Sequence, residues 1–211
     1  ELLRQTSAEA GNHNTIFFTG NGEESRHSIS FNRLVETSFP LSYGGIHNSA
    51  VKTVAKLIWE SFDMTTAEHF LSTSNVFDMP IQAFHQVSLG AAPLALVPSV
   101  YALRADGKKT KAYWPFEGAP AIPSYICAGT SVPKDALIAV IKKLRGPRFS
   151  RFYAENGCLY SCAPDDPLPD LSFLEGSRTN RELLVPSESF LSSLPAETFY
   201  EMYHRVFPAG S

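Results

Sequence analysis

The first candidate site in this sequence is a loop with two consecutive glycines, placed just before a helical pattern. Glycines let a ligand approach the backbone closely, and the free N–H groups at a helix start attract anions. The loop therefore suits an anionic group or an oxyanion, although a tight turn without a ligand explains the same residues. This segment, called the Gly-Gly loop below, consists of Ser42, Tyr43, Gly44 and Gly45.

Two polar side chains, Ser99 and Tyr101, follow the apolar run of residues 94–97. That run has the length and composition of a buried strand. Because ligands of α/β sheets bind beyond the carboxyl ends of strands, both side chains are candidate ligand contacts. The alternative is a tyrosine that packs in the interior with its hydroxyl satisfied.

An aromatic turn supplies the third candidate, Trp114 and Glu117 in the segment YWPFEGA. An aromatic face beside a carboxylate suits a cation such as a polyamine or thiamine, through cation–π contact and ion pairing. The alternative is an aromatic core with an exposed glutamate.

The histidines give a weaker metal signal. Imidazole is a common zinc ligand, but the spacing of His47, His69 and His85 does not predict that they converge. Only His47, which adjoins the Gly-Gly loop, is kept as a candidate metal ligand.

Strand and helix patterns alternate along the chain, which predicts an α/β fold with a mixed or parallel sheet flanked by helices. Asn48 or Ser49 is expected to cap the helix after the Gly-Gly loop. Thr65 or Thr66 is expected to cap the next helix, with Glu68 completing a capping box. Strands are predicted over residues 15–19, 94–97, 112–116 and 122–128, and helices over residues 1–11, 49–62, 65–71, 80–88, 132–143 and 194–207.

Composition excludes two classes of function. The 211 residues are 44% hydrophobic and 18% charged, as in globular proteins. The net charge of −3 argues against nucleic-acid binding, because that function requires a surface rich in Lys and Arg. No apolar run approaches the roughly 20 residues of a membrane span, so no membrane insertion is expected. The residues from Glu1 onward do not show the charged and then apolar pattern of a secretory signal peptide.

The cysteines leave two interpretations open. Cys158 and Cys162 can form a disulfide, which would indicate an oxidising compartment. The alternative is three unpaired thiols, with Cys127 in the core. The sequence has no Gly-x-Ser-x-Gly elbow, no phosphate-binding loop and no His-Glu-x-x-His motif, so an enzyme is not predicted.

Residues 39–144 resemble the extracellular solute-binding proteins of ABC transporters, in the type II class that handles iron, thiamine, polyamines and small anions. The resemblance rests on PLALVPSVYA, YWPFEGAPAIPSYICA and SVPKDALIAVIKKLRG. It implies a type II periplasmic-binding-protein fold with two lobes and a reduced first lobe. Residues 1–40 would be a remnant of the first lobe, residues 41–128 the second lobe, and residues 129–211 the return to the first lobe with the C-terminal helices.

The resemblance also implies a function: capture of a metal ion, an anion or a small cation between the lobes, by hinge closure. It makes Tyr101 a candidate metal ligand beside His47, because ferric-binding members use tyrosines after the matching strand. The bound metal would be iron or zinc, the location periplasmic or secreted, and the partner a membrane transporter. Two alternatives remain, a ligand-sensing domain of a transcriptional regulator and an enzyme on the same scaffold.

Overall fold

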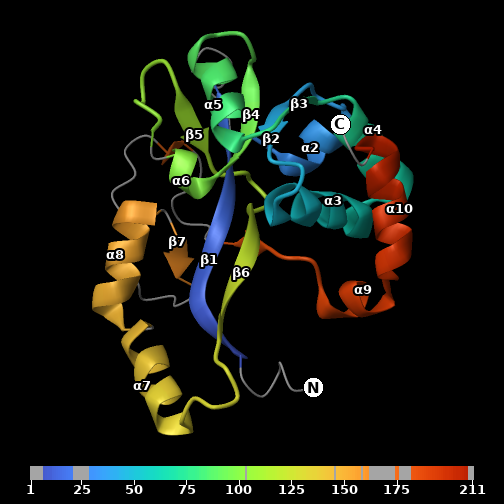
Figure 1. The fold of residues 1–211 in the computed structure, drawn as a ribbon. Coiled ribbons are helices and arrows are strands. Elements are labelled where there is room, and N and C mark those ends of the chain that lie inside the picture. The colour runs from blue at the N-terminus through green and yellow to red at the C-terminus, as the bar shows by residue number, and fades with distance from the viewer. Residues whose placement is uncertain are drawn as a thin grey trace.

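A mixed sheet with helices on both faces forms the centre of the molecule (Figure 1). The computed structural model describes residues 7–20, 29–102, 104–144, 146–157, 159–161, 174–175 and 182–208. Within these residues, no helix is both long enough and apolar enough to cross a membrane.

The direction of the strands determines at which edge of the sheet the loops after them lie. β2 is parallel to β3 and β4, whereas β1 is antiparallel to both β4 and β5. β4 and β5 therefore run the same way, and the carboxyl ends of β2, β3, β4 and β5 lie at one edge of the sheet. The order is β3 (Asn75–Phe77), β2 (Ser42–Gly44), β4 (Leu94–Pro98), β1 (Ser7–Gly20), β5 (Lys111–Tyr113) and β8 (Leu174–Glu175).

Strand β4 shows how the sequence builds two core layers, because its successive side chains point to opposite faces. Leu94 and Leu96 enter the larger core cluster, and Ala95 and Val97 enter a smaller one with α5 (Pro80–Ser88). The larger cluster is covered by α2 (Phe31–Glu36), α3 (Ser49–Ser61), α4 (Met64–Ser72) and α10 (Ala196–Val206).

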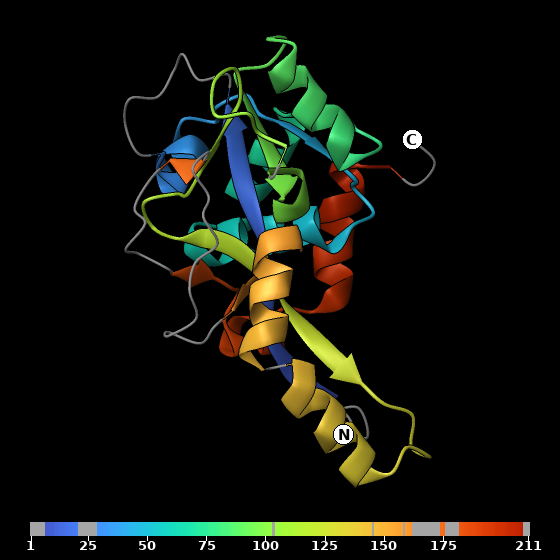
Figure 2. The same cartoon turned by 90° about the vertical axis from the view of Figure 1, so that its left-hand side faces the viewer.

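Strand β1 is long and belongs to two parts of the molecule. Its residues 16–20 pair with β4, and its residues 7–15 pair with β6 (Ala119–Cys127). This second part, called the α7–α8 part below, also holds β7 (Leu159–Ser161), α7 (Lys134–Leu144) and α8 (Pro147–Gly157). Figures 1 and 2 show α7 and α8 end to end alongside β1 and β6.

The remaining short elements link the second part back to the main sheet. β9 (Leu183–Leu184) runs parallel to the start of β6, and α9 (Glu188–Ser193) precedes α10. The α10 helix then packs beside α4 (Figure 1). The C-terminal helix α10 thus helps to cover the main sheet.

Several predicted elements are confirmed by the structure. The helices expected over residues 49–62 and 80–88 are α3 and α5, and the strand over residues 94–97 is β4. The strand expected over residues 112–116 is shorter, because β5 ends at Tyr113. The helix expected over residues 194–207 is α10.

Two local predictions are wrong. Residues 7–11 form the start of β1 rather than a helix, because their backbone pairs with the end of β6. Helix α4 is capped by Asp63, whose carboxylate accepts from the Thr66 N–H at 2.6 Å, and Glu68 pairs with Arg205 instead of closing a capping box. By contrast, the helix expected over residues 132–143 is confirmed as α7, which ends at Leu144, and Pro147 opens the next helix, α8, where a proline without N–H is tolerated.

Some predictions lie outside the described residues or are not tested. Cys158 and Cys162, and with them the disulfide, lie outside the described residues. The division at residues 40 and 128 stays a prediction.

Candidate functional site

The candidate site is the edge where the strands of the main sheet end. Gly45 follows β2, Ser99 follows β4 and Trp114 follows β5. With neighbouring strands about 4.8 Å apart, β2 and β5 are separated by roughly 14 Å along this edge. The topology therefore brings the three predicted groups to one place, called the carboxyl edge below.

The carboxyl edge faces the α7–α8 part. Strand β1 changes partners here, since Ile16 pairs with Pro98 of β4 and Thr15 pairs with Ala121 of β6. The short helix α6 (Ser99–Ala102) begins directly after β4 and contacts α8. The edge thus lies at the junction of the two parts, where two long strands connect them.

The Gly-Gly loop owes its glycines to close backbone packing. A Cβ on Gly44 would lie 2.3 Å from the carbonyl oxygen of Met79, and Gly45 has φ of +76°. The Gly45 N–H donates to the Phe77 carbonyl at 2.9 Å, and its own carbonyl accepts from the Asn48 N–H at 2.7 Å. The loop is therefore held firmly against the connection between β3 and α5.

Two predicted ligand residues of this loop are buried. Ser42 and Tyr43 are each 1% exposed. The Tyr43 hydroxyl donates to the Leu71 carbonyl at 3.0 Å, and its ring meets Phe207 edge-on. Burial, with a smaller contribution from Tyr203, raises the pKa of Tyr43, so its phenol stays protonated. The hydroxyl of Tyr43 thus bonds within the core.

Tyr101 lies half-buried in α6, against the core cluster that contains Phe84. The guanidinium carbon of Arg104 lies 5.6 Å from the centre of the Tyr101 ring, within cation–π range. An exposed arginine on the ring gives this end of the carboxyl edge a positive charge.

Trp114 and Glu117 have defined structural positions. Trp114 is only 3% exposed. The Glu117 carboxylate accepts hydrogen bonds from the Ser30 hydroxyl and from the backbone N–H groups of Phe31 (2.8 Å) and Asn32 (3.3 Å). Glu117 therefore caps the start of α2. Because Glu117 is distant from Ser30 in the sequence, no local pattern predicts this role.

His47 is exposed on the connection between the Gly-Gly loop and α3. Its backbone carbonyl accepts from the Lys52 ammonium at 3.4 Å. Among the described residues, no group of three or more His, Cys, Asp or Glu side chains could hold a metal ion. The predicted metal ligands Tyr101 and His47 therefore stay predictions.

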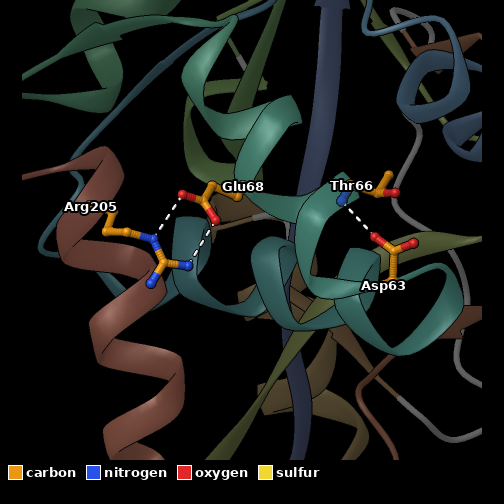
Figure 3. A network of polar contacts seen from close by, with 4 residues as sticks. All are labelled: Asp63, Thr66, Glu68 and Arg205. Atoms are coloured by element: carbon orange, nitrogen blue, oxygen red, sulfur yellow. Dashed lines mark hydrogen bonds and ion pairs between the residues drawn. The ribbon is translucent and has the colours of Figure 1, made fainter.

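A pocket of about 680 Å³ lies beside the edge strand β3, and no motif in the sequence indicates it. Its wall includes the ion pair between Glu68 and Arg205, in which Nε and Nη2 donate to the two carboxylate oxygens at 2.9 and 2.8 Å (Figure 3). We call it the flank pocket. It does not include Ser99, Tyr101 or Trp114, and it reaches the carboxyl edge only at Ile46, Phe77 and Asp78.

The comparisons with known proteins concern the fold. No protein-family model and no curated protein matches the chain. Among solved structures, the ferric binding protein from Campylobacter jejuni matches 96% of this chain and 70% of its own, at 12% identity and a TM-score of 0.70. The chain has the type II periplasmic-binding-protein fold. The fold expected from the resemblance is therefore confirmed.

Two further structures with the type II fold match with similar scores. A periplasmic thiamin binding protein covers 95% of this chain at 12% identity, with 66% of its own length and a TM-score of 0.64. A two-component system protein that mediates signal transduction covers 94% at 13% identity, with 69% of its own length and a TM-score of 0.66. The chain spans 61% of the length of one such structure, apo FutA2 from Synechocystis PCC6803, and 70% of that of the Campylobacter jejuni protein.

Proposed function

We propose that this chain binds a small solute at the carboxyl edge and that the main sheet and the α7–α8 part close around it. The observation that carries this proposal is the meeting of the Gly-Gly loop, Ser99 and Trp114 at one edge, where β1 and β6 connect the two parts. Two connecting strands form a hinge of the kind that lets lobes rotate. Binding would shift an existing equilibrium between open and closed forms.

The ligand would be held by groups from both ends of the edge. The Gly-Gly loop would form the wall at one end rather than donate to the ligand, because the Tyr43 hydroxyl and the N–H and carbonyl groups of Gly45 are already bonded. Tyr101 would supply a hydroxyl group, the backbone at Ser99 would lie beside the ligand at the start of α6, and the segment from Trp114 to Glu117 would line the far end. No chemical step is part of this function.

Two ligands deserve testing first, since the matching structures include a ferric binding protein and a thiamin binding protein. Tyr101 and His47 are the proposed ligands for a metal ion, iron or zinc. For an organic ligand, Tyr101 would supply aromatic surface, since Trp114 is only 3% exposed. By the same likeness, we propose a periplasmic location and delivery of the ligand to a membrane transporter.

A sensing role is the second candidate, because one matching structure is a two-component system protein. In that case the closed form would be recognised by a signalling partner rather than by a transporter. The binding step at the carboxyl edge would be the same.

A thermal-shift screen with ferric citrate, zinc, phosphate, thiamine and spermidine tests the proposal. A ligand at a hundred times its dissociation constant should stabilise the protein by about 2.7 kcal/mol. The stabilisation should shrink in Tyr101→Phe and persist in the control Tyr200→Phe, which changes an exposed tyrosine on α10. Equal stabilisation of the two variants would mean that the ligand binds elsewhere. If no compound raised the melting temperature, the protein would not bind these classes of ligand.

A further inference from the structure

The flank pocket has an apolar floor and a polar rim. Leu71 and Phe207 on its floor are 1% and 8% exposed, and Ile46, Phe77 and Val206 are partly buried beside them. Its volume of about 680 Å³ is in the range of pockets that hold small organic molecules. The floor can therefore take up the apolar body of a ligand.

The rim of the flank pocket carries an excess of negative charge. Glu68 and Arg205 neutralise each other through their two hydrogen bonds. Asp78, which follows β3 and also lines the pocket, is exposed, and no ion pair to it is present among the described residues. The formal charge of Glu68, Arg205 and Asp78 together is therefore −1, from two carboxylates and one guanidinium.

Helix ends also contribute to the potential. Helix α4 lines the pocket both at its first turn, through Thr65, and at its carboxyl end, through Leu71 and Ser72, where the Leu71 carbonyl already accepts from Tyr43. Helix α10 lines the pocket only near its carboxyl end, through Arg205 and Val206. Because the carboxyl end of a helix carries a partial negative charge of roughly half an elementary charge, α10 favours the same sign of ligand as the side chains.

We propose that the flank pocket is a second binding site, specific for a small organic cation with an apolar body. The ammonium or similar head group would lie between Asp78 and the carboxyl ends of α4 and α10, and the body would cover the floor at Phe207. The site is distinct from the proposed solute site, because Ser99, Tyr101 and Trp114 do not line it. Ile46 is its point of contact with the loop that follows Gly45.

Three probes of matched shape test the charge preference: 2-phenylethylamine, 2-phenylethanol and 3-phenylpropionate. Amide NMR titrations of the full chain measure binding, with dissociation constants expected in roughly the millimolar range for ligands this small. The amine should perturb the amides of Ser72, Ser74 and Asp78. The alcohol should bind about tenfold more weakly, and the acid more weakly still.

Variants test the location. Asp78→Asn should weaken binding of the amine about threefold, whereas Asp135→Asn on α7 should leave it unchanged. Ser72 is exposed on the rim of the pocket. The variant Ser72→Trp should fill the pocket and abolish binding of the amine, and circular dichroism checks that this variant is folded. Tyr101→Phe should have no effect, which separates this site from the carboxyl edge.

Equal binding of the amine and the alcohol would overturn the proposed cation specificity. Amide perturbations that cluster away from α4, β3 and α10, or undiminished binding in folded Ser72→Trp, would overturn the site itself. Neither result depends on whether a solute binds at the carboxyl edge.

Discussion

The hydroxyl of Tyr203 donates a 2.5 Å hydrogen bond to the carbonyl oxygen of Ile46. Tyr203 is 3% exposed, and burial raises its pKa, so the phenol remains a donor at all physiological pH values. The bond joins residues 157 positions apart, and it ties α10 to the chain just after Gly45. The C-terminal helix therefore helps to fix the Gly-Gly loop.

Tyr203→Phe should lower the free energy of unfolding by about 1–3 kcal/mol, because the Ile46 carbonyl loses its donor in a partly buried place. Chemical denaturation measures the change. Tyr200→Phe on the same helix is the matched control, since Tyr200 is 43% exposed, and it should change stability by less than about 0.5 kcal/mol. Equal losses in the two variants would show that the bond to Ile46 contributes nothing.

The glycines of the Gly-Gly loop can be ranked against a third glycine. Gly90 has φ of +73° with nothing within 4 Å of a built Cβ, so Gly90→Ala should cost only the backbone strain of about 1 kcal/mol. Gly45→Ala adds a contact of 2.3 Å with the Asn48 side chain, which can move. Gly44→Ala meets the Met79 backbone at the same distance and should cost the most, about 3 kcal/mol or more.

Thermal or chemical unfolding of these three variants tests that order. A Gly44→Ala protein as stable as Gly90→Ala would mean that the loop is loosely packed. The glycines would then have to be explained by a ligand rather than by packing.

Glu117→Gln should destabilise the protein by about 1–2 kcal/mol, because the charged acceptor at the start of α2 is lost. Ser30→Ala should cost a similar amount, and the double variant should cost less than the sum, since both residues act in one cap. Full additivity in this cycle would contradict the capping role. Measuring ligand affinity on the same samples tests whether Glu117 also contacts the solute.

Asp106 gives a pH-dependent prediction. Its carboxylate accepts from the N–H groups of Thr110, Lys108 and Lys109, which lowers its pKa from 3.8 to about 2. The stabilisation is thus fully present above about pH 3.8 and is lost as pH falls towards 2. The stability difference between the protein and Asp106→Asn should shrink over that window, and an NMR titration midpoint near 3.8 would contradict the turn geometry.

The sequence predicted best where local pattern and final environment agree. The uninterrupted apolar run of residues 94–97 indicated a strand buried on both faces, and β4 contributes to both core clusters. The helical spacing of residues 49–62 likewise matched the buried face of α3. In these elements the spacing of the apolar residues shows both the type of element and the side that packs against the core.

The sequence failed where a distant partner decides the structure. Residues 7–11 form a strand because β6, more than 100 positions later, pairs with them. Glu117 caps α2 across a separation of 86 residues from Phe31. The flank pocket is formed by α4, β3 and the end of α10, which are far apart in the sequence, so no local pattern predicts it.

Solute binding at the carboxyl edge is best tested by amide NMR mapping of whichever compound stabilises the protein in the thermal-shift screen. The perturbed amides should cluster at Gly45, Ser99 and Trp114, together with residues of β1 near Ile16. Perturbations confined to other surfaces, with these amides unchanged at saturation, would contradict solute binding at the carboxyl edge.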